Sequence, residues 1–297
     1  MKAIRTRRPG SISQLELVDT PVPAPAPTQI RVRVHATSVT RGDAVLRKMP
    51  TALLRLFRVP AKPVLGHEFA GVVDALGDDA VGFAPGARVF GSTSGTPHGA
   101  HAEYVIVDAD GLVVEIPDHV GFDEAAPVPI GAMTALHFLD EAGVAAGRSV
   151  LVNGASGSVG SYAVQIARAR GAHVTAVCSG RNAQLALDLG ADEVIDHTAT
   201  DVARLDRRFD VVFDAVGTLK KGAASRLLAD GGSFVTIRTQ RDETLEELLE
   251  VRDLLASGSL RAVIDREFPL ERIPEAHELV ESRRKRGNVL IRVVVDG

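Results

Sequence analysis

Five short apolar runs between residues 149 and 237 constrain the fold of this chain more than any other feature. The runs are SVLVNG (149–154), HVTAVCS (173–179), DEVIDH (192–197), DVVFDAVG (210–217) and GSFVTI (232–237). Segments with helical character separate them, and near-continuous apolar runs of this kind are typical of parallel strands that are covered on both faces. The sequence therefore predicts a doubly wound α/β domain over residues 121–264.

A glycine-rich segment joins the first of these runs to the helix that follows it. The segment is NGASGSVG (153–160), with Gly154, Gly157 and Gly160 between the apolar VLVN and an alanine-rich helical stretch. Glycines in this setting let an anion approach the backbone, and the N–H groups at the start of the helix point toward it. We therefore expect dinucleotide binding here; the alternative is a plain strand-to-helix turn, which many glycine triplets form.

The end of the second run indicates which dinucleotide is bound. A site that prefers NAD places a carboxylate there to hold the ribose 2′-hydroxyl, and residues 173–182 contain none. Ser179 and Arg181 stand there instead, and a hydroxyl with a guanidinium suits a 2′-phosphate. The sequence favours NADPH; the alternative is that both residues cap the next helix and face water.

The first part of the chain has the period of antiparallel β-structure. Between residues 29 and 37, Ile30, Val32, Val34 and Ala36 alternate with more polar residues, which predicts a strand with one buried face. Further short β-like runs follow, each bounded by turn residues: 69–76, 87–91, 101–108 and 112–117. We expect a β-rich domain over 1–120, completed by residues 265–297, because the tail returns to β character.

Composition excludes several classes of function. The formal net charge is -4, so the chain has no basic field for nucleic acid. The N-terminal MKAIRTRRPG lacks the apolar stretch of a signal peptide and no later run would span a membrane, so we expect a cytoplasmic protein with no membrane partner. The single cysteine, Cys178, excludes an internal disulfide and a four-thiolate zinc site.

Several motifs together carry a resemblance to a known family. They are GHEFAGVV (66–73), PGARVFG (85–91), AEYVIV (102–107), AAPVPIGAMTALHFL (125–139), the block 149–197 and FDAVG (213–217). On these the chain resembles, nearly end to end, the quinone oxidoreductase branch of the medium-chain dehydrogenase/reductase family. The resemblance implies a GroES-like catalytic domain, a Rossmann domain and NADPH-dependent reduction of quinones or α,β-unsaturated carbonyl compounds.

The resemblance also implies roles for individual residues. Ser156 to Val159 would meet the pyrophosphate, Thr134 the nicotinamide side, and Val216 with Gly217 the adenosine or ribose edge. Asn288 stands where relatives often have a lysine that contacts a cofactor phosphate. The complete set of expected cofactor residues is Thr134, Gly154, Ala155, Ser156, Gly157, Ser158, Val159, Gly160, Ser179, Arg181, Val216, Gly217 and Asn288.

No metal is expected in the catalytic site. Zinc-dependent relatives place cysteines before and after a Gly-His-Glu, whereas this chain has SVTRGD (38–43) before His67-Glu68 and no thiolate after it. Hydride transfer to a conjugated carbon needs no strong Lewis acid, so Thr40, Asp43 and His67 are the catalytic candidates. Thr40 would hydrogen-bond the substrate, and His67 would donate or shuttle a proton.

Two alternatives to this function stay open. One is a protein that binds NADPH without turnover, as a redox sensor or interaction module. The other is a zinc-enzyme lineage that replaced its thiolates with carboxylates. The short polar RTQRDET (238–244) stands where relatives carry a further helix and strand, so we expect the sheet to lack one strand and the chain to be a monomer or a homodimer.

Overall fold

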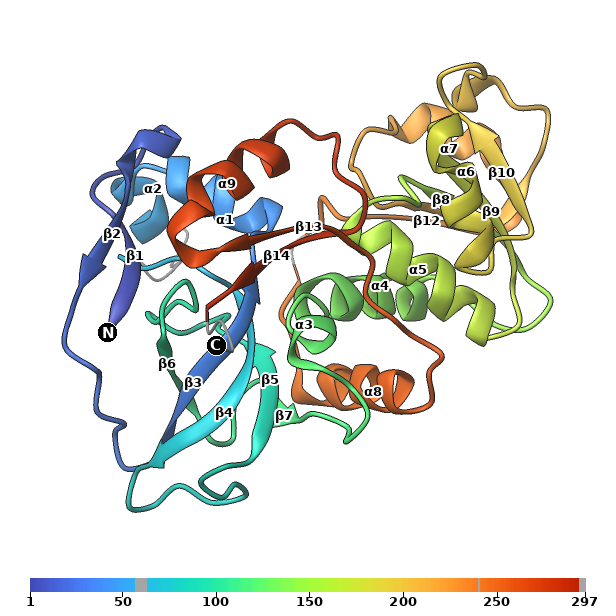
Figure 1. The fold of residues 1–297 in the computed structure, drawn as a ribbon. Helices are drawn as coiled ribbons and strands as arrows, with labels where there is room; N and C mark the ends of the chain where they lie inside the picture. The colour runs from blue at the N-terminus through green and yellow to red at the C-terminus, as the bar shows by residue number, and fades with distance from the viewer. Residues whose placement is uncertain (57–62, 240, 294–297) are drawn as a thin grey trace. The chain divides into compact units, whose positions relative to one another are not determined.

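The computed structural model describes residues 1–56, 63–239 and 241–293 (Figure 1). The chain forms two compact units. Unit 1 comprises Met1–Ile130, Thr244–Arg252 and Ile264–Gly297, and unit 2 comprises Gly131–Glu243 and Asp253–Val263. The first unit therefore runs to Ile130 and takes in part of a later helix. The domain boundaries expected from sequence, near 120 and 264, stay a prediction.

Unit 1 is built around a largely antiparallel sheet. Its strand order is β13-β14-β3-β4-β5-β7, with β6 also paired to β3, and only β13 and β14 run parallel. The strands are β3 (Gln29–Ser38), β4 (Glu68–Leu76), β5 (Arg88–Ser92), β6 (Tyr104–Asp108), β7 (Val113–Glu115), β13 (Ile264–Pro269) and β14 (Asn288–Arg292). A separate hairpin pairs β1 (Lys2–Thr6) with β2 (Leu15–Asp19). The tail thus joins this unit, because β14 pairs with β3.

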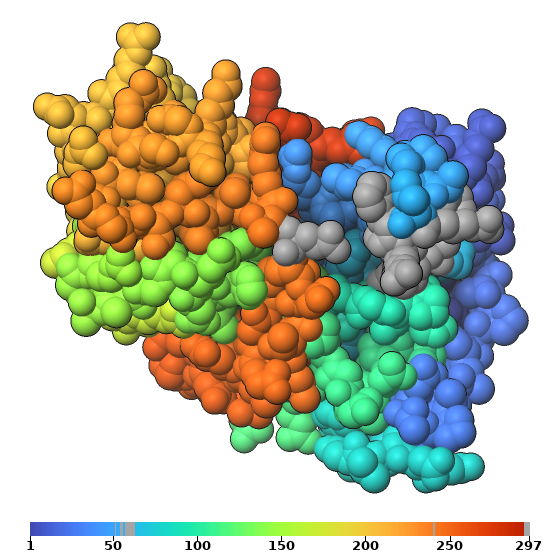
Figure 2. All heavy atoms as spheres, turned by 180° about the vertical axis from the view of Figure 1, so that it is seen from behind, coloured from blue at the N-terminus to red at the C-terminus, as the bar shows by residue number. Residues whose placement is uncertain are grey.

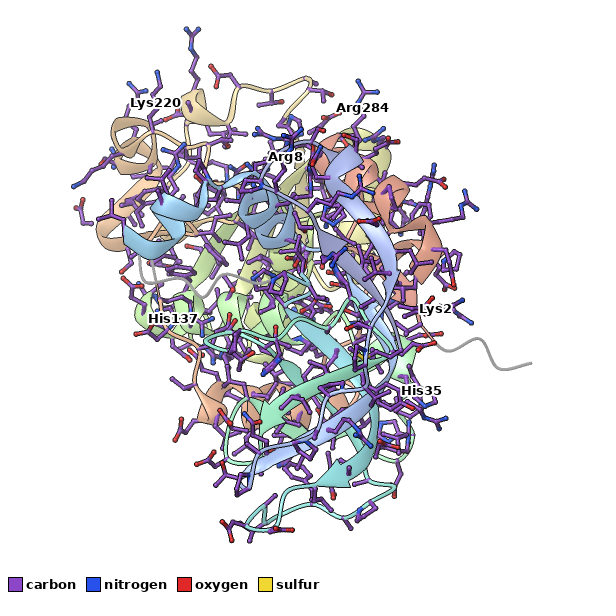
Figure 3. All side chains as sticks on the ribbon, turned by 90° about the vertical axis from the view of Figure 1, so that its left-hand side faces the viewer. Lys2, Arg8, His35, His137, Lys220 and Arg284 are labelled. Carbon is purple, nitrogen blue, oxygen red and sulfur yellow. The ribbon has the colours of Figure 1, made fainter. Side chains whose placement is uncertain are left out.

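The central strand β3 shows why the predicted alternation succeeds. Ile30, Val32, Val34 and Ala36 are all buried, and the first three join residues of the neighbouring strands in one core. The helices of unit 1 are α1 (Arg41–Lys48), α2 (Thr51–Leu56), α3 (Phe122–Ala125) and α9 (Ile273–Glu281). His35 of β3, labelled in Figure 3, stacks on Phe122 of α3 with 4.2 Å between ring centroids.

Unit 2 contains the predicted parallel sheet. The order of its five strands is β10-β9-β8-β11-β12, and each strand runs parallel to its neighbours. They are β8 (Ser149–Asn153), β9 (His173–Cys178), β10 (Glu193–Asp196), β11 (Phe209–Asp214) and β12 (Leu228–Thr236). Strand β12 ends the sheet in the described part of the chain, and Figure 2 shows the segment around it, in orange, at the molecular surface.

Helices connect these strands as a doubly wound fold requires. They are α4 (Pro129–Glu141), α5 (Ser158–Ala169), α6 (Ala183–Asp188) and α7 (Lys221–Leu227), followed by α8 (Leu245–Ala256). Helix α5 packs on β8 and β9, and α7 packs on β11 and β12. Gly160 to Ala167 of α5 are buried throughout, so the sheet and neighbouring helices enclose this helix.

The predicted fold class is confirmed. One unit is β-rich and mainly antiparallel, and the other is a doubly wound parallel sheet of five strands. Among the described helices, none combines the length and hydropathy that a membrane crossing requires.

Candidate active site

The glycine segment forms a tight turn between β8 and α5. Gly154 has a φ of 84°, in the left-handed region that favours glycine. The N–H groups of Gly154 and Ala155 both donate to the carbonyl of Val177 in β9, at 3.0 Å each. The main chain of the loop is therefore fixed against the end of the neighbouring strand.

Two of the glycines leave no room for a side chain. A Cβ at Gly160 would overlap the carbonyl oxygen of Gly154, which lies on the other side of the turn. A Cβ at Gly154 would overlap the side chain of Val216, which follows β11. The turn is thus closed back onto the first residues of its own helix, and the loop after β11 lies directly over it.

The start of α5 is free to bind an anion. Its N-cap is Gly157, which supplies no side-chain acceptor for the first N–H groups. Those groups have no acceptor within the helix either, because the first turn of any α-helix lacks them. Ser156, Gly157, Ser158 and Val159 are all partly exposed. This cradle fits the pyrophosphate of a dinucleotide, since bare N–H groups and the positive end of the helix dipole converge on it.

The turn after β9 carries the two residues expected at a 2′-phosphate. Ser179 is partly exposed and makes no side-chain capping bond, and Arg181 is exposed. The structure adds a carboxylate from the next strand: Asp196, at the end of β10, lies against Gly180, where an added Cβ would overlap its Oδ2. Hydrogen bonds from Thr198 lower the pKa of Asp196, so this acid is ionised beside the turn.

Asp214, which sequence reasoning missed, organises the loop after β11. Its Oδ1 accepts from Asn153 Nδ2 at 2.8 Å and from the Gly217 N–H at 3.0 Å, and its Oδ2 accepts from the Leu219 N–H at 2.8 Å. Gly217 has a φ of 75°. The signal was present in the sequence, because Asp214 is an acidic residue inside the otherwise apolar run that ends β11, and a buried carboxylate needs such partners.

Thr134 lies on α4 near the glycine turn. One turn earlier on α4, Gly131 packs so closely on Ser158 and Tyr162 that a Cβ there would approach both to under 3 Å. Residues three apart share a helix face, so Thr134 points from the same side of α4. The place of Thr134 beside the nicotinamide stays a prediction.

In unit 1, Thr40 and Asp43 form a capping box at the start of α1. The Thr40 Oγ1 accepts from the Asp43 N–H at 3.1 Å, and the Thr40 N–H donates to Asp43 Oδ2 at 2.8 Å. The Thr40 hydroxyl also donates to Oδ2 at 2.6 Å. The two residues that sequence reasoning selected as catalytic are therefore joined, and they also begin a helix.

Asp43 binds His67 through its other oxygen. Its Oδ1 accepts from His67 Nδ1 at 2.7 Å and from the Gly66 N–H at 2.9 Å. Burial opposes ionisation of this fully buried carboxyl, but His67, His101 and the Thr40 hydroxyl outweigh it and hold the pKa of Asp43 well below its usual range. An ionised Asp43 keeps the proton on Nδ1 of the imidazole, which leaves Nε2 for exchange.

Glu68 points away from this pair. Its carboxylate accepts from the Ser38 hydroxyl and, at 2.9 Å, from the Ile130 N–H. Burial raises the pKa of Glu68 to about 7, and the neighbouring charge of Asp43 acts in the same direction. His101, also buried, donates from Nε2 to the Ser38 carbonyl at 2.9 Å.

The side chains of Asp43 and Glu68 are not arranged as zinc ligands. Both oxygens of Asp43 are committed to N–H and O–H donors, and Glu68 is bound to Ser38 and Ile130. Across the described residues, no three His, Cys, Asp or Glu side chains converge in a way that would hold a metal ion. The only cysteine, Cys178, lies in unit 2 at the end of β9.

One expected cofactor residue, Asn288, lies in unit 1. Asn288 is buried and begins β14 in unit 1. Close before it, Lys285 donates to the carbonyl of Gly287, and burial lowers the pKa of Lys285 to about 8. Lys220, labelled in Figure 3, is exposed at the N-cap of α7. The assignment of Asn288 to the cofactor stays a prediction.

The expected residues thus fall into two groups. The glycine loop, Ser179, Arg181, Val216 and Gly217 gather at the carboxyl ends of β8, β9 and β11 in unit 2, as the Rossmann prediction requires. Thr40, Asp43 and His67 form one hydrogen-bonded group in unit 1. The role of each of these residues stays a prediction.

Comparison with known proteins shows similarity along most of the chain. Residues 26–118 match the family model described as alcohol dehydrogenase GroES-like domain, and residues 158–282 match the one described as zinc-binding dehydrogenase. A 2-methylene-furan-3-one reductase from Solanum lycopersicum is 33% identical over 78% of this chain, which spans 64% of the length of that protein. A mitochondrial NAD(P)H oxidoreductase from Mus musculus is 32% identical over a region that covers 77% of this chain and 70% of the mouse protein.

Solved structures show the same likeness in three dimensions. The quinone oxidoreductase from Coxiella burnetii superposes with a TM-score of 0.86 and 28% identity, covering 99% of both chains. The β-rich unit is therefore a GroES-like domain and the parallel-sheet unit a Rossmann-like domain. The mouse relative is named as a mitochondrial protein, so the cytoplasmic location of this chain stays a prediction.

Proposed function

The chain belongs to the quinone oxidoreductase branch of the medium-chain dehydrogenase/reductase family, and from this premise we propose that it reduces a quinone or an α,β-unsaturated carbonyl compound with NADPH, without a metal. As a member of that branch it is an NAD(P)H-dependent oxidoreductase acting on a small molecule. The choice of NADPH and the substrate class are the parts that we propose.

The observation that carries the proposal is the cradle at the start of α5. Gly154 and Gly160 have no space for a side chain, and Gly157 leaves the helix N-terminus uncapped. When bound, NADPH supplies a hydride at its nicotinamide. The residues that would hold it are the loop 154–160, Thr134, Val216 and Gly217, with Ser179 and Arg181 at the 2′-phosphate.

The hydrogen-bonded group Thr40, Asp43 and His67 in unit 1 is suited to supplying the proton that the reaction needs. Reduction of a quinone or an enone places negative charge on the substrate oxygen, which a hydrogen-bond donor stabilises and a proton then neutralises. His67 would provide that proton from Nε2 when it is the imidazolium, and it would then remain as the neutral imidazole whose Nδ1–H donates to ionised Asp43 at 2.7 Å. The Thr40 hydroxyl, which donates to Asp43 Oδ2 at 2.6 Å, would have to turn from that carboxylate to donate to the substrate oxygen.

The relatives support both substrate classes. The tomato protein is named for a 2-methylene-furan-3-one, which is an enone, and the Coxiella burnetii structure is titled a quinone oxidoreductase. Both compounds present a carbon made electrophilic by a conjugated carbonyl group. Such carbons accept hydride directly, whereas oxidation of a simple alcohol requires removal of a hydroxyl proton.

The test is the rate of NADPH oxidation by chelator-treated protein with a soluble quinone and with a short enal, and NADH in parallel. We expect turnover with NADPH, and we expect Arg181→Ala to raise the KM for NADPH while the KM for NADH stays unchanged. Equal use of NADH by the wild type would contradict the assignment of Ser179 and Arg181 and would point to Asp196 as a ribose contact. Tight binding of NADPH without turnover would favour the redox-sensor alternative. Activity that is present before chelator treatment and lost after it would favour the zinc-enzyme lineage.

A further inference from the structure

A buried amide beside the glycine loop has no part in the site described so far. Asn182 ends the 3₁₀ helix η2 (Gly180–Asn182) and is the N-cap of α6. Asparagine is favoured at that position because its side chain accepts from the first N–H groups of the helix. The Asn182 side chain makes no such bond. It is therefore available for a different contact.

That contact crosses to the glycine loop. The Asn182 Nδ2 donates to the hydroxyl oxygen of Ser156 at 3.0 Å, while the Asn182 N–H donates to the Ser179 carbonyl at 2.8 Å. The residue is only 5% exposed, so the bond to Ser156 is shielded from water. One side chain thus ties the loop after β8 to the turn after β9 that carries Ser179 and Arg181.

The second end of the same amide is unsatisfied. Asn182 Oδ1 is buried and has no hydrogen-bond partner among the described residues. Buried polar atoms without a partner are rare in folded proteins, because burial removes the water that would otherwise bind them. A ligand that arrives at the carboxyl ends of β8 and β9 would supply the missing group. In a doubly wound fold that ligand is the adenosine half of a dinucleotide.

We propose that Asn182 is a positioning residue of the dinucleotide site, which holds Ser156 in place and binds a hydroxyl group of the adenosine ribose. A ribose hydroxyl donates to a carbonyl oxygen and also accepts from an NH₂ group, so it suits the amide in either of its two orientations. The inference rests on the proposed function, because it requires the glycine loop to bind a dinucleotide.

The test pairs a change in the protein with a change in the ligand. Binding of ADP, 2′-deoxy-ADP and 3′-deoxy-ADP is measured by calorimetry for the wild type and for Asn182→Ala. Because the 2′-oxygen of NADPH carries its phosphate, we expect 3′-deoxy-ADP to bind the wild type about tenfold more weakly than ADP, and we expect that difference to vanish in Asn182→Ala. Gln184→Ala is the matched control, because the Gln184 amide donates at 2.8 Å to Asp188 on the exposed side of α6.

Kinetics give a second readout that a purely structural role would not produce. Asn182→Ala should raise the KM for NADPH about tenfold and leave kcat within about twofold, since the residue touches no reacting atom. Equal binding of ADP and both deoxy analogues by the wild type overturns the ribose contact, whether or not the variant folds. Failure of the wild type to bind NADPH at all would instead overturn the proposed function.

Discussion

At the scale of single residues, Glu68 gives this protein a pH-dependent stability. Its pKa in the folded chain is about 7, above the ordinary 4.5, so the protonated form is favoured by folding. The stabilisation is fully present below pH 4.5 and is lost as the pH rises through 7, by about 3 kcal/mol at most. Asp43, with its lowered pKa, acts in the opposite sense and loses its contribution only in acid.

Urea unfolding at pH 5 and pH 8 measures this dependence. Gln at position 68 can accept from the Ile130 N–H through its oxygen and donate from its NH₂ to the Ser38 hydroxyl, and it cannot ionise. We therefore expect the free energy of unfolding of Glu68→Gln to exceed that of the wild type at pH 8 and not at pH 5. A pH-independent difference between the two proteins would show that Glu68 does not titrate in this range.

Gly160 is the residue whose replacement should damage the dinucleotide site most. An added Cβ would overlap the Gly154 carbonyl oxygen, so Gly160→Ala forces the turn away from α5. We expect a loss of about 1 to 3 kcal/mol in the free energy of unfolding and a large loss of NADPH affinity.

Gly222→Ala is the control for this substitution. Gly222 lies within α7, and nothing would lie within 4 Å of an added Cβ. Alanine should stabilise that helix by about 0.5 to 1 kcal/mol. Similar thermal transitions for the two variants would contradict the packing argument.

At the scale of elements, α1 depends on the hydroxyl group of its N-cap residue. Thr40→Ala removes one side of the capping box and a donor to buried Asp43, so we expect a loss of about 1 to 2 kcal/mol in urea unfolding. Thr40→Ser retains the hydroxyl and should stay within about 0.5 kcal/mol of the wild type. Equal losses in the two variants would assign the effect to the methyl group of Thr40.

The elements themselves were largely predictable from sequence, whereas side-chain networks were not. In β3, apolar residues alternate with polar ones because one face of the strand is buried. The strands of unit 2 are apolar almost throughout because both faces of the parallel sheet are covered, and the glycine triplet marks the turn between β8 and α5. The contact of Asp214 with Asn153 and that of Asn182 with Ser156 could not be predicted, because each joins residues that are distant in sequence. The same holds for Asp196, which comes from β10 to a turn whose own sequence contains no acid.

At the scale of the whole molecule, the proposed binding of NADPH to the folded Rossmann-like unit, and not to the unfolded chain, should raise the melting temperature. A concentration of 100 times Kd adds about 2.7 kcal/mol to the free energy of unfolding. Differential scanning fluorimetry over a range of NADPH concentrations checks this. Gly160→Ala should give a much smaller shift, and an undiminished shift in that variant would place the cofactor elsewhere.

The C-terminal strand also sets the order in which the protein can be completed during translation. Strand β14 pairs with Ala36 to Ser38 of β3, so the ribosome has synthesised both units before that edge of the first sheet is covered. All five strands of the second sheet precede β13 and β14 in the chain, and domains fold as they emerge. The Rossmann-like unit can therefore fold while one edge of the GroES-like sheet is still unpaired. An unpaired strand edge is prone to aggregation, so this is the stage at which a chaperone would be most useful.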